Sequence, residues 1–149
     1  MNQTIKTLLE IQEIDKHVHE LKENIRAMDV NVKTKENVIK ILIKELEEID
    51  AKIITLKEDR KYNEQLVEDK NDQIKTLDNK SALVKNTKEQ KALEVEMSMA
   101  NTSVEKIEDQ IVSLLSDIDT YIEKRDIKQK EADSLKAEYE LLSKTTEIK

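Results

Sequence analysis

The sequence predicts an all-α fold, a long antiparallel two-helix coiled-coil hairpin, and three observations support this. First, the chain has 149 residues and contains neither glycine nor proline, whereas average usage would give about ten glycines and seven prolines. Second, apolar residues recur at alternating steps of three and four, the spacing of a coiled coil. Third, the pattern runs in two phases, separated by a stretch rich in turn and capping residues at 77–87. Two phases indicate two helices with a reversal between them.

The composition disfavours a broad compact core. Charged residues make up 40% of the chain and aromatic residues 2%, with three Tyr and no Phe or Trp, so the bulky side chains that usually fill a globular core are missing. High charge with low hydrophobicity is also typical of disorder. The disorder hypothesis is disfavoured because a random polar chain would not hold one heptad register over so many repeats.

The first apolar ladder predicts a helix over about residues 3–78. It has a polar gap at Lys35, and it becomes looser from Arg60 onward, where polar residues take several of its positions. Its apolar members up to the loose part are Ile11, Ile14, Val18, Leu21, Ile25, Met28, Val32, Ile39, Leu42, Leu46, Ile49, Ile53 and Leu56.

The second ladder predicts a helix that runs to about residue 146. Its apolar members include Leu93, Met97, Ala100, Val104, Ile107, Ile111, Leu114, Ile118, Tyr121, Ala132, Leu135, Tyr139 and Leu142, interrupted by Arg125 and Lys128. The tip is expected at about residues 79–82, with a loop to residue 87 as the alternative. Ser81, or Thr87 with Gln90 three residues later, is the expected N-cap of this helix.

Antiparallel packing requires the residue numbers of facing pairs to add to a constant. The two ladders allow a sum of 160, with a tight turn at Asn79 and Lys80, or a sum of 167, with a loop near 79–87. We favour 160, which places Ile53 against Ile107. In that register Lys35 faces Arg125, and Lys128 lies nearby, so like charges would crowd one part of the seam.

Charge and composition exclude several classes of function. A net charge of −7 disfavours a general binder of nucleic acid or of membrane surfaces, which are polyanionic. Without cysteine the chain can form no disulfide or thiolate metal site. The first twelve residues lack a secretory apolar stretch and no segment is long and apolar enough to span a membrane. These features predict a cytoplasmic protein.

The residue pattern favours a protein that is not an enzyme and that needs no cofactor or metal. His17 and His19 are two positions apart, which directs them to different sides of a helix, so they cannot chelate one metal together. The many carboxylates lie on predicted exposed faces, and solvation explains them better than catalysis does. The sequence contains no glycine-rich phosphate loop and no cysteine nucleophile.

Three features stand out from this background. Residues 75–91 carry five lysines and two acids, a local charge of +3, and residues 92–123 carry eight acids and one lysine, a local charge of −7. Each pattern also suits a surface that only keeps the protein soluble. Ile43, Leu115 and Ile122 lie beside the ladders and widen the apolar stripe, which indicates either a thicker two-helix core or contact with a further helix.

Two strings resemble the bacterial four-cysteine zinc-ribbon proteins, in which a long coiled-coil hairpin precedes a zinc ribbon. They are Leu8-Leu-Glu-Ile-Gln-Glu-Ile-Asp15 and, at the tip, Val84-Lys-Asn-Thr-Lys-Glu-Gln-Lys-Ala-Leu-Glu-Val-Glu96. The second resembles the family's Lys-Asn-x-Lys-Glu-x-x-Ala-Leu-x-x-Glu pattern, although Gln90 stands where the family usually has Tyr. The zinc-binding cysteines are absent, so the resemblance covers the hairpin alone.

The resemblance implies an adaptor of flagellar or type III secretion systems that binds the alternative sigma factor sigma-54. The expected protein-binding residues are Lys85, Asn86, Lys88, Glu89 and Leu93, with the stripe at Ile43, Leu115 and Ile122 as a second candidate. A structural spacer, which could form a homo-oligomer, is the alternative from another class. A prefoldin-like holding chaperone would need exposed apolar residues at the open end. Nucleic-acid binding at the basic tip is disfavoured because no aromatic residue is there to stack on bases.

Overall fold

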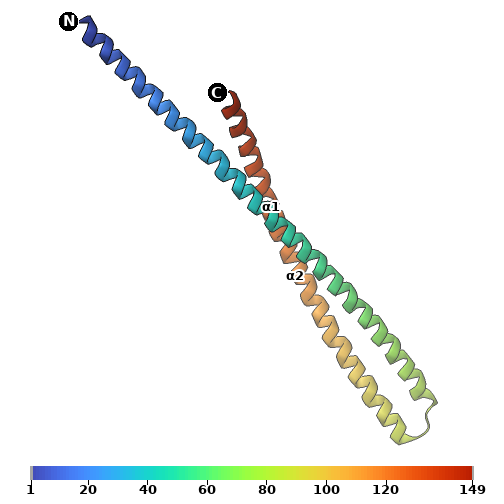
Figure 1. Cartoon of the computed structure of the whole chain (residues 1–149). Helices are drawn as coiled ribbons and strands as arrows, with labels where there is room; N and C mark the ends of the chain where they lie inside the picture. The colour runs from blue at the N-terminus through green and yellow to red at the C-terminus, as the bar shows by residue number, and fades with distance from the viewer. Residues whose placement is uncertain (1, 149) are drawn as a thin grey trace. The chain divides into compact units, whose positions relative to one another are not determined.

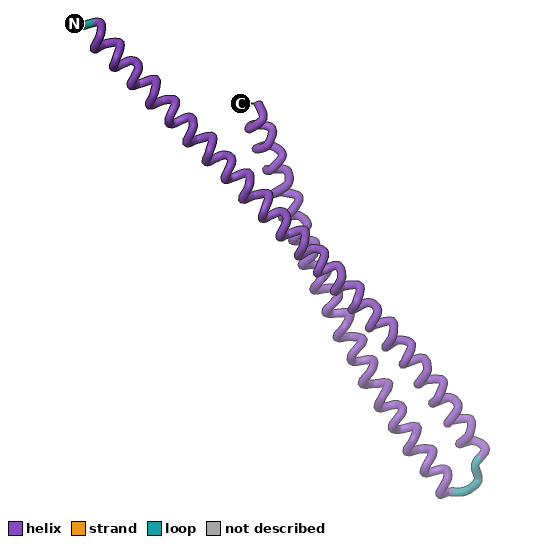
Figure 2. Tube along the Cα trace, viewed as in Figure 1, coloured by secondary structure: helices purple, strands orange, loops and turns teal. Residues whose placement is uncertain are grey.

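The structure, a computed structural model, consists of two long α-helices packed against each other (Figure 1). It describes the backbone of residues 2–148 and the side chains of residues 2–145. Helix α1 spans Gln3–Leu83 and helix α2 spans Thr87–Ile148. No strand occurs among the described residues, and the loop between the helices has only three residues (Figure 2). The predicted all-α antiparallel hairpin is confirmed.

The reversal lies further along the chain than the favoured tight turn, within the alternative loop at residues 79–87. Helix α1 continues through Asn79, Lys80 and Ser81 and ends at Leu83, and the loop is residues 84–86. The expected tight turn at Asn79 and Lys80 is therefore wrong. The reason is that Asn, Lys, Ser and Ala cost a helix only a few tenths of a kcal/mol each, and no glycine or proline is present to stop it.

The N-cap of α2 is Asn86, so the predicted caps Ser81 and Thr87 are wrong. The Asn86 side-chain Oδ1 accepts a hydrogen bond of 2.9 Å from the backbone N–H of Lys88. Its backbone carbonyl accepts the first helical hydrogen bond, from the N–H of Gln90. Glu89 places a carboxylate in the first turn of α2, where the helix dipole favours negative charge. Asn86 and Glu89 thus have the spacing of a capping box.

The chain divides into two compact units, each of which contains residues of both helices. The tip unit is Glu47–Asp126, and the end unit holds the residues up to Leu46 together with those from Ile127 onward. In the end unit Leu42, Leu46 and Ala132 form a buried cluster with Leu135 packed against it. In the tip unit the buried side chains are Ile53, Leu56, Leu77, Ala100, Val104 and Ile118. Both cores consist of residues that the two ladders predict.

Neither predicted register is correct. In the end unit Lys35 Nζ lies 2.6 Å from Glu138 Oε2, and Lys128 pairs with Glu45. The residue numbers of both pairs add to 173. In the tip unit Arg125 lies 3.7 Å from Asp50, a pair whose numbers add to 175. The observed sums therefore lie about one heptad above the predicted 167 and about two heptads above the predicted 160. Both errors have the same cause, because sliding one helix by seven residues keeps every a and d position facing the partner helix.

The corrected register also removes the expected crowding of like charges. Lys35, Arg125 and Lys128 each face a carboxylate of the opposite helix. All three cations are half-buried beside the apolar seam, so the paired carboxylates offset the cost of taking a cation partly out of water. The polar ladder positions therefore serve as interhelical ion pairs.

Candidate partner-binding surface at the tip

An apolar groove opens where α1 ends and α2 begins. Its volume is about 430 Å³, and its apolar lining consists of Leu83, Val84, Ala92 and Leu93. Lys80, Glu89 and Glu96 complete the wall and provide both signs of charge. We call this set of seven residues the tip groove.

The tip groove exists because the ladder contacts stop before the loop. The last buried residue of α1 is Leu77, and the first of α2 is Ala100. Beyond them the side chain of Leu83 is 81% exposed. The chain contains no glycine or proline that would permit a tighter reversal. The last turn of α1 and the first turns of α2 therefore leave apolar side chains uncovered.

The five residues predicted at the tip lie together at this end of the tip unit. Glu89 and Leu93 line the tip groove. Lys85 and Lys88 are exposed beside it. Asn86 is the helix cap, so part of the string that resembles the zinc-ribbon family serves the fold. These five residues stay a prediction as a binding site.

The structure adds Leu83, Val84 and Ala92, which the sequence interpretation missed. In the favoured register, in which the numbers of facing residues add to 160, Leu83 would face Leu77 and be covered. The usable signal was Leu83-Val84, two adjacent apolar residues that precede Lys85 and Asn86. Adjacent residues of a helix point to different sides, so both could not face the seam.

The second predicted set is not brought together in one unit. Ile43 belongs to the end unit and is half-buried. Leu115 and Ile122 belong to the tip unit, where Ile122 is half-buried and Leu115 is 39% exposed. Partial burial beside the seam fits a thicker two-helix core within each unit.

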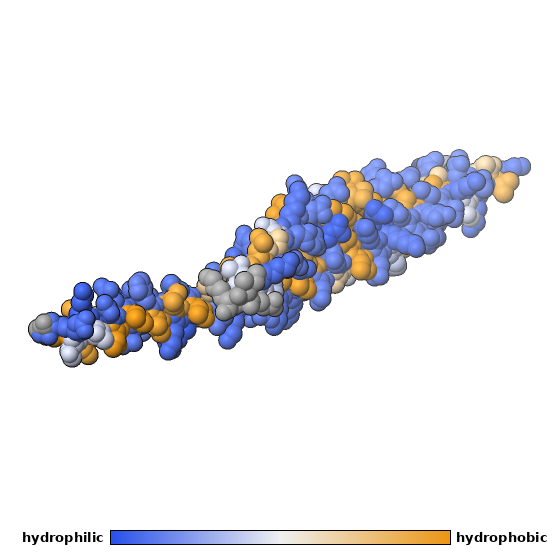
Figure 3. All heavy atoms as spheres, turned by 90° about the horizontal axis from the view of Figure 1, so that it is seen from above, coloured by the Kyte–Doolittle hydropathy of each residue, from blue (hydrophilic) through white to orange (hydrophobic). Residues whose placement is uncertain are grey.

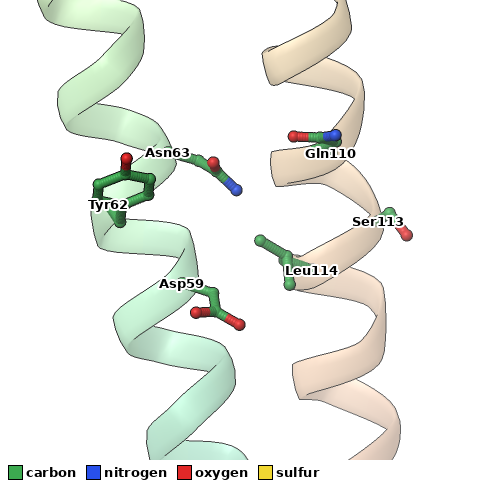
Figure 4. Close-up of a pocket in the computed structure, with 6 residues that line it drawn as sticks. All are labelled: Asp59, Tyr62, Asn63, Gln110, Ser113 and Leu114. Atoms are coloured by element: carbon green, nitrogen blue, oxygen red, sulfur yellow. The ribbon is translucent and has the colours of Figure 1, made fainter.

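A polar cavity of about 280 Å³ interrupts the seam of the tip unit (Figure 4). Asp59, Tyr62 and Asn63 of α1 line it, opposite Gln110, Ser113 and Leu114 of α2. Leu114 and Asn63 project into the space between the helices. Nearby, Nε of Arg60 is buried without a hydrogen-bond partner and lies 3.6 Å from Glu64. This is the loose stretch of the first ladder, where polar side chains do not fill the seam.

The carboxylates and histidines of the described residues form no group of three that could hold a metal ion. His17 lies 3.9 Å from Glu20 one helical turn away, and both are exposed. The eight acids within residues 92–123 are all exposed on α2. No helix of the described part is long and apolar enough to cross a membrane.

Comparison with known proteins identifies a similar fold. No protein-family model and no curated protein matches the chain. Among solved structures it is similar to the HP0958 protein of Helicobacter pylori, with 25% sequence identity and a TM-score of 0.75. The alignment covers 98% of this chain and 62% of HP0958. The chain thus spans 62% of the length of that protein, and the similarity extends over the whole two-helix hairpin.

Proposed function

We propose that this chain is a non-enzymatic adaptor that binds a protein partner through its tip groove. The observation that carries the proposal is an apolar groove at the end of a highly charged hairpin, with Leu83 largely exposed to solvent. Exposed contiguous apolar surface on a soluble protein commonly marks an interaction site.

The groove suits one face of an amphipathic helix from the partner. Such a helix places apolar residues at steps of three and four, which would cover Leu83, Val84 and Leu93. Lys85 and Lys88, exposed beside the groove, would attract acidic residues that flank the apolar face. The proposed ligand is therefore an apolar helical segment bordered by carboxylates.

Two further points support a regulatory or secretion partner. The tip string resembles the bacterial four-cysteine zinc-ribbon family, whose members bind sigma-54 or act in flagellar and type III secretion systems. The similarity to HP0958 over the whole hairpin supports the long-hairpin architecture that this resemblance implies. We therefore propose sigma-54 first, and a flagellar or secretion component second, as the partner in a bacterial cytoplasm.

The test is a binding titration of purified sigma-54 with four forms of the chain. The unaltered chain should bind. Leu83→Gln should weaken binding about tenfold or more, because it removes an apolar anchor from the groove. Lys85→Glu with Lys88→Glu should weaken it several-fold, mainly by slowing association, and the loss should shrink at high salt.

Ile54→Gln is the matched control. Ile54 is 58% exposed on α1 of the same unit, so the substitution also removes an exposed apolar side chain, but it lies outside the tip groove. Binding should be unchanged. Helicity of all four forms should be equal, because the altered residues are exposed. Equal weakening by Leu83→Gln and Ile54→Gln would contradict the tip groove as the site, and no binding by any form would exclude sigma-54.

A further inference from the structure

The first third of α1 carries an apolar ladder that α2 does not cover. Every residue from Asn2 to Ala27 is exposed, and Met28 is the first half-buried one. We call residues 3–27 the free segment. In Figure 2 no described helix lies beside it, and Figure 3 shows apolar side chains along it. Its five ladder residues, which are between 43% and 61% exposed, are Ile11, Ile14, Val18, Leu21 and Ile25.

This ladder is built to pack against another helix. Its five consecutive ladder positions are all apolar, whereas the covered part of α1 includes Lys35, Arg60 and Lys70 at ladder positions. Most of the stability of a helix in a protein comes from the packing of its apolar face. Heptad spacing gives a narrow stripe that fits one facing helix with the same spacing.

The charges of the free segment are compatible with a second copy of the chain as the occupant. The free segment carries five acids against four Lys or Arg residues, so two copies would approach each other with little net repulsion. By contrast, the acidic stretch of α2 at residues 92–123, with a charge of −7, would repel the same stretch of a second copy. Asp15 and Lys22 flank the ladder on the same side and are in no ion pair among the described residues.

The flanking charges also select the direction of pairing. In a parallel pair, Glu10 of one copy would face Asp15 of the other, and His17 would face Lys22, so no attractive pair forms. In an antiparallel pair, residues that flank the ladder on the same side meet each other. With Val18 of one copy against Leu21 of the other, Asp15 lies beside Lys22 of the second copy, and the symmetry repeats this contact. All ladder layers in this register are apolar.

We propose that two copies of the chain form an antiparallel dimer through their free segments, with Val18 of each copy packed against Leu21 of the other. Antiparallel pairing also places the α2 helices, which already occupy the seam of α1 beyond Met28, at opposite ends of the contact. The free segment and the tip groove have no residue in common.

The first experiment is a charge swap followed by sedimentation equilibrium. The unaltered chain should change from monomer to dimer as concentration rises through the micromolar range. Asp15→Lys should raise the dimer dissociation constant roughly threefold or more, because both symmetry-related ion pairs become repulsive. Asp15→Lys combined with Lys22→Asp should restore dimerisation, because the pair is then attractive again with its signs exchanged. If the two copies paired in another register, the double substitution would not restore dimerisation.

An apolar disruption provides the matched control. Ile14→Lys should abolish dimerisation without loss of helicity in the hairpin. Ile54→Lys, which alters a similarly exposed isoleucine outside the free segment, should leave dimerisation unchanged. Since the chain has no cysteine, mixing a Val18→Cys chain with a Leu21→Cys chain should give an intermolecular disulfide faster than either chain alone.

Three results would overturn the proposal. One is a monomer at every concentration up to the solubility limit. Another is self-cross-linking of each single-cysteine chain at the rate of the mixture, which would indicate parallel pairing. The third is a monomeric form of the protein extended past Lys149, which would assign the stripe to a segment of the same chain.

Discussion

Two stretches of α1 carry the same heptad ladder and have opposite fates. In the covered stretch Ile39, Leu42 and Leu46 are 7% to 9% exposed, whereas in the free segment Ile14 and Leu21 are about 60% exposed. Both stretches belong to one unbroken helix in one compact unit. The comparison teaches that a heptad pattern specifies a face that will be covered but does not specify which helix covers it.

The difference between the two stretches comes from α2. Ala132 and Leu135 of α2 pack against Leu42 and Leu46, and ion pairs from Glu45 to Lys128 and from Lys35 to Glu138 flank this cluster. Each apolar side chain fully removed from water contributes roughly 1.5–3 kcal/mol. The free segment gains none of this from the described residues, so its stability should depend on concentration if copies pair.

The largest expected effect comes from shortening one leucine in each stretch. Leu46→Ala should lower the free energy of unfolding by about 2–4 kcal/mol, because the side chain is buried and a cavity remains. Leu21→Ala should lower it by less than about 1 kcal/mol when measured below the dimerisation range. Urea unfolding followed by circular dichroism gives both values. Equal losses would mean that the free segment is covered within the monomer.

A smaller effect is expected from enlarging one buried alanine and one exposed alanine. Ala132 is fully buried against Leu42 and Leu46, so Ala132→Leu should overfill the seam and cost about 1–3 kcal/mol. Ala27 is exposed, and Ala27→Leu should change stability by less than about 0.5 kcal/mol. Thermal melting of the two variants distinguishes them. A stabilising Ala132→Leu would show that the seam has room for a larger side chain.

The smallest effect is expected from the ion pairs. Glu45→Gln removes the carboxylate that faces Lys128 across the seam and should cost about 0.2–1 kcal/mol, since both side chains are only half-buried. Glu23→Gln removes a pair with Arg26 within the free segment and should cost less than about 0.5 kcal/mol. The urea midpoints should converge at high salt, where such pairs are screened. If the stability lost in Glu45→Gln does not depend on salt, the loss comes from side-chain packing and the ion pair contributes little.

The tip shows which parts of a site a sequence can reveal. Lys85, Lys88 and Glu89 were identified from charge and family resemblance, and they lie in or beside the tip groove. Leu83 was missed because its exposure depends on where α1 stops. Asn86 was assigned to recognition, yet its side chain caps α2. Residue type and local spacing therefore located the region, while the role of each residue required coordinates.

By itself the sequence determined the helices, their number and which face of each is apolar, because those properties follow from the absence of helix breakers and from periodicity along one chain. Only the tertiary structure decided the register, the cap and the uncovered surfaces. Sliding one helix by seven residues preserves every a and d contact, so the ladders alone cannot distinguish registers one heptad apart. The position of the loop at residues 84–86 resolves that degeneracy. The same loop leaves Leu83 exposed, and the described part of α2 does not cover the ladder from Ile11 to Ile25.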